Sequence, residues 1–186
     1  ESTTVTPMPL YSNTVLIQRG CNRKCGFCKT QYMHMPPIST PVETVVKAIN
    51  EAVNNGHADI NLLAENSTEY GFEFKEDKCN LLDLLKRISR IQGIKSIALS
   101  GICLDELAQD SSLLEYIIQS ELIYKLQLEV QSLIPNVRKK MRLTTSVMDV
   151  LEILKLLREK HIIGNVMVGY PGETSSEFNK QLQLLS

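Results

Sequence analysis

The chain has 186 residues, of which 43% are hydrophobic and 22% are charged, so it can bury a core and one globular domain is expected. Its 20 basic and 21 acidic residues give a net charge of −1, which excludes a strong overall attraction to nucleic acid or to an anionic membrane. No run approaches the roughly 20 consecutive apolar residues that span a bilayer, and no signal-like N-terminus is present, so a soluble, cytoplasmic protein is expected.

Residues 1–13 are rich in Thr, Ser and Pro without a hydrophobic period, so we expect a linker or N-terminal extension there. Residues 14–186 are expected to form one domain, in which short β-branched runs alternate with longer stretches of helical spacing. The expected strands are 14–18, 58–63, 95–100, 124–130 and 162–168. The expected helices begin near positions 41, 81, 104, 112, 146 (running to about 160) and 174.

Several helix starts carry capping signals. Thr40 and Glu43 have the spacing of a capping box, with Pro41 in the first helical position. Asn80 and Ser112 are expected to cap two later helices.

Strands that alternate with helices in this way predict an α/β fold with a parallel sheet, because each parallel crossover needs a helix's length of chain. The five βα units are expected to close into a barrel or partial barrel. The sequence stops at Ser186, about three turns into the last expected helix, so the barrel is expected to be truncated after its fifth unit, without a sixth strand.

Three cysteines crowd into the loop after the first expected strand. Cys21, Cys25 and Cys28 are separated by three and two residues, which lets three thiolates bind three irons of one [4Fe-4S] cluster, and Gly26 permits a tight backbone wrap. The fourth iron is left without a protein ligand and can bind a substrate. Arg23 and Lys24 would offset the negative charge of the ligated cluster.

Two other interpretations of these thiols remain open. A structural zinc site needs a fourth ligand nearby, for which His34 is the only candidate, and the cysteines could also be unrelated thiols. An odd total of five cysteines argues against a disulfide framework and for a reducing compartment. Cys79 and Cys103 are expected to be small buried hydrophobic residues.

The three-cysteine motif, with an aromatic residue at Phe27, resembles that of the radical S-adenosylmethionine (SAM) superfamily. This resemblance implies a partial (β/α)6 barrel with its active site at the carboxyl ends of the strands. It also implies a reduced cluster that cleaves SAM to methionine and a 5'-deoxyadenosyl radical, which abstracts hydrogen from an unactivated carbon. A one-electron reductant such as flavodoxin or ferredoxin is the implied partner.

The resemblance assigns further positions to SAM binding. Phe27 corresponds to a residue whose backbone faces the adenine, and Arg142 to a basic residue that pairs with the methionine carboxylate. The implied contacts to the methionine amino group are Ala64, Glu65 and Asn66. Those to the ribose and the methionine end are Glu129, Gln131 and Ser132, and those along the adenine are Val168 and Gly169.

Within the superfamily, the sequence resembles the methylthiotransferases, which modify a tRNA adenosine or a ribosomal-protein aspartate. The similarity lies in segments 20–28, 38–43, 66–71, 130–132 and 168–174. It departs from the family at 33–36, where an Arg-Gly pair is usual, and at Leu133, where glycine is usual.

Methylthiotransferases also carry a second cluster domain and an RNA-binding barrel, which these residues do not show, so we expect SAM cleavage without complete methylthiolation. Two alternatives remain: another radical branch that acts on a peptide, porphyrin or lipid, and a non-catalytic binding module that retains the fold.

Overall fold

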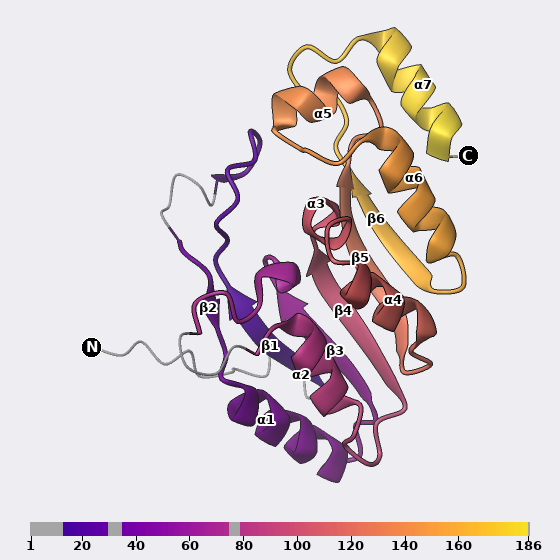
Figure 1. Ribbon diagram of the computed structural model, residues 1–186. Coiled ribbons are helices and arrows are strands. Elements are labelled where there is room, and N and C mark those ends of the chain that lie inside the picture. Colours follow the sequence, from indigo (N-terminus) through magenta and orange to yellow (C-terminus); the bar gives the residue numbers. More distant parts are fainter. Residues whose placement is uncertain (1–12, 30–34, 75–78, 186) are drawn as a thin grey trace.

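A twisted, mostly parallel sheet forms the centre of the computed structural model, which describes residues 13–29, 35–74 and 79–185 (Figure 1). Within these residues the sheet has six strands in the order β2-β1-β3-β4-β5-β6. The strands are β1 (Thr14–Arg19), β2 (Ile38–Ser39), β3 (Asp59–Ala64), β4 (Ser96–Ile102), β5 (Ile123–Gln131) and β6 (His161–Val166). Only β2 is antiparallel to its neighbour, while β1, β3, β4, β5 and β6 pair in parallel.

Helices lie between the parallel strands along the chain, and the last helix follows the last strand. They are α1 (Val42–Asn54), α2 (Leu81–Ile88), α3 (Leu104–Leu107), α4 (Ser111–Gln119), α5 (Pro135–Met141), α6 (Val147–Leu156) and α7 (Ser175–Leu185), with a short 3-10 helix at Ser67–Glu69. Figure 1 shows α1, α2, α4 and α6 side by side along one face of the sheet, with α5 and α7 beyond the end of β5. This is the α/β partial barrel that the alternating pattern predicts.

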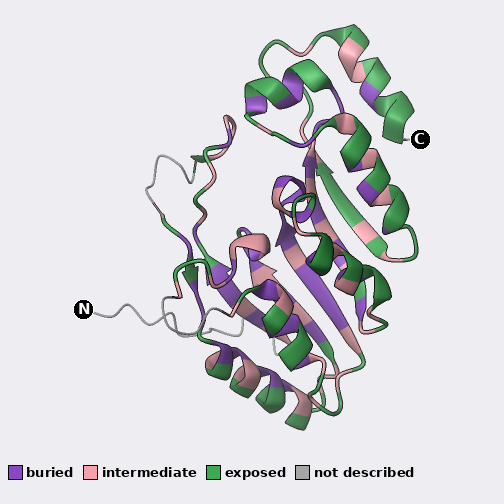
Figure 2. Cartoon of the chain, in the orientation of Figure 1, coloured by how far each residue is buried: buried purple, intermediate pink, exposed green. Residues whose placement is uncertain are grey.

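Strand β5 shows how the two faces of the sheet differ. Leu126, Leu128 and Val130 are buried in the core beneath the helices. Glu129 and Gln131 alternate with them, are only partly buried and lie on the other face. Successive side chains of a strand point to opposite faces, so buried and partly buried residues alternate along β5. Figure 2 colours the buried residues of the sheet purple, and Glu129 and Gln131 form a polar surface at its carboxyl end.

The predicted strands are confirmed, but some helix starts are wrong. Thr40 does not cap α1, because its hydroxyl donates a hydrogen bond of 2.8 Å to the carbonyl oxygen of Leu16 and the helix starts without a side-chain cap. The cap of α4 is Asp110, whose carboxylate accepts from the Leu113 N–H at 2.9 Å, and not Ser112.

Other helix predictions have mixed outcomes. The Asn80 cap of α2 is confirmed, with Asp83 completing a capping box. Helix α6 ends at Leu156, short of the predicted end near position 160, and neither α5 nor β2 was expected.

Two predictions cannot be compared with the structure. The linker at 1–13 falls outside the described residues except for Asn13, and so does His34, the proposed fourth zinc ligand. Among the helices that the structure describes, none is both long enough and apolar enough to cross a membrane.

Candidate active site

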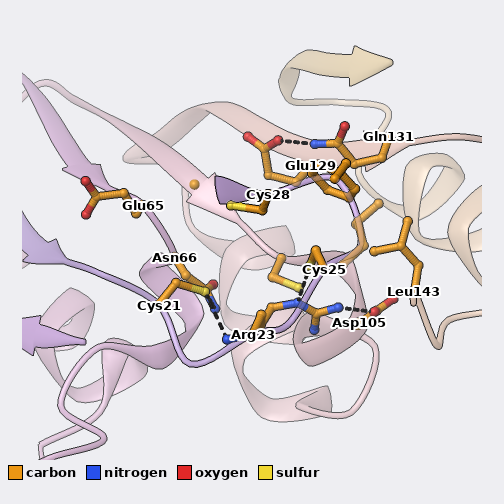
Figure 3. A pocket seen from close by; sticks show the side chains of 14 residues that line it. Cys21, Arg23, Cys25, Cys28, Glu65, Asn66, Asp105, Glu129, Gln131 and Leu143 are labelled. Carbon is orange, nitrogen blue, oxygen red and sulfur yellow. Dashed lines mark hydrogen bonds and ion pairs between the residues drawn. The ribbon is translucent and has the colours of Figure 1, made fainter. Parts of the chain in front are cut away.

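A cavity of about 180 Å³ lies where the strands of the sheet end. Residues from the loop after β1, from the ends of β3, β4 and β5 and from the loop after α5 form its wall (Figure 3). They are Cys21, Arg23, Cys25, Phe27, Cys28, Glu65, Asn66, Gly101, Cys103, Leu104, Asp105, Glu129, Gln131 and Leu143. The cavity therefore joins the cysteine motif to polar residues that are far from it in the sequence.

The cysteine loop is held at both ends by backbone contacts. Gly20 has φ +76°, and a side chain there would collide with the carbonyl oxygen of Pro36. The Gly26 N–H donates to the Met141 carbonyl oxygen at 2.9 Å, and a Cβ on Gly26 would lie 2.7 Å from the Lys140 carbonyl oxygen. Glycine is needed at position 26 because α5 approaches the loop closely.

The three motif cysteines share the cavity without gathering around one point. Cys25 is buried, Cys21 and Cys28 are partly buried, and all three line the cavity. Among the described residues, no three or more His, Cys, Asp or Glu side chains surround a position that could hold a single metal ion. In a [4Fe-4S] cluster each cysteine binds a different iron, so three thiolates that line one cavity are compatible with a cluster.

Hydrogen-bond donors point at two of the sulfurs. The Arg23 Nε–H lies 3.5 Å from the Cys25 Sγ, and the Arg23 backbone N–H lies 3.4 Å from the Cys21 Sγ. The Asn66 side-chain amide donates to the Cys21 Sγ at 3.6 Å. Donors of this kind stabilise anionic, metal-bound sulfur.

Burial raises the pKa of the Cys21 thiol to about 12, although hydrogen bonds from Arg23 and Asn66 oppose the shift. The thiol is therefore protonated at neutral pH without metal, and iron binding must displace its proton.

Two loops of the site are joined through a fully buried amide. The Gln18 side chain donates to the Gly20 carbonyl oxygen at 2.8 Å and accepts from the Asn66 N–H at 3.2 Å. The Glu65 carboxylate accepts from the Gly20 N–H at 2.6 Å. The segments after β1 and β3 are thereby fixed relative to each other.

Glu129 and Gln131 form the opposite wall of the cavity, above the cysteines in Figure 3. The Gln131 amide donates to the Glu129 carboxylate at 2.7 Å, and the Asn165 amide donates to it at 3.1 Å. Gln131 has φ 61°, a left-handed conformation that is uncommon outside glycine and that clusters at functional sites.

Five of the residues assigned to SAM binding do not line the cavity. Ala64 is buried, and Val168 is 62% exposed. The Gly169 N–H donates to Glu173 at 2.7 Å. Their roles, with those of Ser132 and Arg142, stay predictions.

Ser132 and Arg142 are engaged elsewhere. Ser132 is fully buried, and its hydroxyl donates to the Gln181 side-chain oxygen at 2.9 Å. Arg142 is exposed with φ 60°, and its guanidinium donates to the Lys24 carbonyl oxygen at 3.3 Å.

The sequence reasoning missed the part of the wall that follows β4. Cys103 and Asp105 line the cavity there. Cys103 is buried as expected, whereas Cys79 is only partly buried. Burial raises the pKa of the Cys103 thiol to about 12, so it is neutral. The available signal was an acidic residue soon after a buried strand, which places Asp105 near the edge where parallel strands end.

The sequence matches the family model of the radical SAM superfamily over residues 15–185. The chain belongs to the radical SAM superfamily. Membership implies a [4Fe-4S] cluster and SAM, and the contacts described above fit both.

The fold is the radical SAM partial barrel. The structure of the methyltransferase TsrM from Kitasatospora setae, with cobalamin and a [4Fe-4S] cluster bound, aligns with a TM-score of 0.64 at 16% identity and covers 93% of this chain and 32% of that chain. The cobalamin-dependent radical enzyme OxsB with aqua-cobalamin bound aligns with a TM-score of 0.72 at 13% identity, over 92% of this chain and 26% of that chain. At these identities the likeness concerns the fold alone.

Relatives in sequence are methylthiotransferases. The chain is 30% identical to the ribosomal protein uS12 methylthiotransferase RimO of Clostridium botulinum strain Langeland, over 100% of this chain and 42% of that protein. It is 30% identical to the tRNA-2-methylthio-N(6)-dimethylallyladenosine synthase of Clostridium tetani, over 92% of this chain and 38% of that protein. The chain thus spans about two fifths of the length of the relatives it matches.

Proposed function

We propose that this chain is the catalytic core of a radical SAM methylthiotransferase that cleaves SAM reductively. The observation that carries the proposal is the single cavity in which three motif cysteines face the polar residues that end β3 and β5. The relatives at 30% identity, which act on a ribosomal protein or on tRNA, support the methylthiotransferase branch.

In this proposal Cys21, Cys25 and Cys28 hold the cluster. A bound, reduced cluster supplies the single electron that breaks a carbon–sulfur bond of SAM. Arg23 and Asn66 hold hydrogen-bond donors against the ligating sulfurs. A flavodoxin or ferredoxin is the proposed source of the electron.

The SAM contacts proposed here are the predicted residues that line the cavity. Glu65 and Asn66 line the cavity, and we assign their carboxylate and amide to the methionine ammonium group. Glu129, Gln131 and Phe27 also line the cavity. We assign the Glu129 carboxylate and the Gln131 amide to the ribose hydroxyls and the methionine end, and the Phe27 backbone to the adenine.

Anaerobic iron–sulfur reconstitution tests the cluster and the cleavage together. Wild-type protein should show the absorption of a cubane cluster and should form 5'-deoxyadenosine from SAM and a reductant. Cys21→Ala, Cys25→Ala and Cys28→Ala should each lose both properties. Cys79→Ala, outside the cavity in the loop before α2, is the matched control and should keep them. Full iron loading by any motif variant would overturn the proposal.

A second experiment addresses the methylthiotransferase branch. The full-length protein is incubated with SAM, a sulfide source and either ribosomal protein uS12 or tRNA that carries N6-dimethylallyladenosine. Mass spectrometry should detect a methylthio group on one of them. SAM cleavage without modification of either substrate would instead favour another radical branch, and absence of cleavage would favour a binding module.

A further inference from the structure

We propose that Arg23 sets the reduction potential of the cluster through its contact with Cys25, and that Asp105 is the positioning residue that holds Arg23 in place. This inference rests on the proposed function, since it assumes a cluster on Cys25. Arg23 and Asp105 are not ligands of the cluster, but together they control how readily it accepts an electron.

The Arg23 guanidinium is held on three sides. Its Nε–H points at the Cys25 Sγ, 3.5 Å away, and one terminal nitrogen forms an ion pair with Asp105. The other terminal nitrogen lies 3.4 Å from Glu106 Oε1. Only 18% of the side chain is exposed. A planar guanidinium can hold three such contacts at fixed angles, which a lysine ammonium cannot.

Asp105 is fixed independently of Arg23. Its carboxylate accepts from the backbone N–H groups of Thr144 and Thr145, at 2.9 Å each, and from the Arg138 guanidinium at 3.5 Å. Its side chain is 3% exposed. Because the segment between α5 and α6 orients this carboxylate, Asp105 presents a rigid acceptor that aims Arg23 at the sulfur, as Figure 3 shows.

The contact acts on the redox equilibrium for an electrostatic reason. A positive N–H donor beside a ligating sulfur stabilises the reduced cluster, which carries one more negative charge than the oxidised cluster. The interaction is weakly screened, since Cys25 and Asp105 are buried. Arg23 should therefore make the reduction potential less negative than it would be without the contact.

The test is a redox titration of the cluster in the full-length reconstituted protein. The titration monitors the electron paramagnetic resonance signal of the reduced cluster, which Cys25→Ala should lack. Arg23→Met should shift the midpoint potential to a more negative value. Arg19→Met is the matched control, because Arg19 is exposed at the end of β1 and loses the same charge. Its potential should stay at the wild-type value.

Asp105→Asn distinguishes whether Asp105 acts by positioning Arg23 or only through its own negative charge. Loss of a negative charge alone would make the potential less negative, whereas release of Arg23 from Cys25 makes it more negative. We expect Asp105→Asn to make the potential more negative in the wild-type background and less negative in the Arg23→Met background. A less negative potential in both backgrounds would show that Asp105 acts only as a charge, and would overturn its positioning role.

The remaining variant guards against misfolding. Arg23→Lys keeps the charge but cannot hold all three contacts, and it should load iron normally while its potential falls between those of wild type and Arg23→Met. Wild-type potentials in both Arg23 variants would overturn the inference and leave the proposed function standing. Failure of the wild-type protein to form a cluster would instead overturn the proposed function.

Discussion

The backbone N–H of Gly26 donates a 2.9 Å hydrogen bond to the carbonyl oxygen of Met141, which joins the cysteine loop to the last residue of α5. At the other end of the loop, the Cys21 N–H donates to the Met35 carbonyl oxygen at 3.0 Å. The loop is therefore held between two separate segments of the chain, and its shape depends on both.

Gly26→Ala should distort this loop, because the new Cβ would lie 2.7 Å from the Lys140 carbonyl oxygen. We expect a loss of about 1–3 kcal/mol in the free energy of unfolding and reduced iron loading, measured by denaturant unfolding and iron analysis. Gly164→Ala is the control, since its Cβ would make an ordinary contact of 3.4 Å with Val130. Equal behaviour of the two variants would contradict the prediction.

Arg138→Met should lower the free energy of unfolding more than substitutions of exposed residues do. The buried guanidinium donates to the carbonyl oxygens of Thr145, Val130 and Ser132 at 2.8–3.0 Å and pairs with Asp105. Its removal leaves these acceptors unpaired, at a cost of about 3–5 kcal/mol.

Urea unfolding measures the effect of Arg138→Met. Lys139→Met, an exposed neighbour on the same helix, should change stability by less than about 0.5 kcal/mol. A cost for Arg138→Met as small as that of its neighbour would show that the buried contacts add little.

Ionised Asp105 should stabilise the protein above about pH 4, and this stabilisation should be lost in acid. Burial opposes ionisation, but hydrogen bonds from Thr144 and Thr145, and then Arg23, outweigh it and lower the pKa of Asp105 to about 2 from an ordinary 3.8. A lowered folded-state pKa adds stability above the unfolded-state pKa, and this stability is lost as the pH falls from about 4 to about 2.

This contribution amounts to about 2 kcal/mol for a buried carboxylate with such a shift. In unfolding experiments on metal-free protein, the stability gap between wild type and Asp105→Asn should shrink by that amount between about pH 5 and about pH 2. A gap that stays constant across this range would contradict the assigned pKa.

Gln181→Met should weaken the packing of α7 against the segment that follows β5. The fully buried Gln181 oxygen accepts from the Ser132 hydroxyl and from the Leu133 N–H, both at 2.9 Å. Without that oxygen two buried donors lose their partner, at about 1–3 kcal/mol. Hydrogen exchange should become faster in α7, whereas exposed Lys180→Met should leave it unchanged. Protection of α7 equal to wild type would contradict this role for Gln181.

The sheet could be predicted from the sequence because its signals are local. Each strand is a short apolar run followed by a helix-length stretch, and the alternation in β5 by itself places Glu129 and Gln131 opposite the core. The cysteine motif could be recognised for the same reason, because its spacing is also a local signal.

The rest depends on contacts between distant segments. Helix α5 has only seven residues, three of them basic, and it is held by the packing of Val137 and Met141 against Ile134, Phe27 and Tyr170. No hydrophobic period of that length could be detected. The position of Asp105 after a buried strand was a signal, but its contacts could not be predicted, because its backbone donors come from Thr144 and Thr145, about 40 positions later.

The division of β5 into two faces also has an evolutionary consequence. Leu126, Leu128 and Val130 belong to the core, so selection for a stable fold acts on them. Glu129 and Gln131 lie outside that core, and a mutation there changes the chemistry of the cavity with little penalty for folding. The requirement for a stable fold and the requirement for the chemistry of the cavity therefore fall on alternate residues of one strand, so selection can act on either set separately.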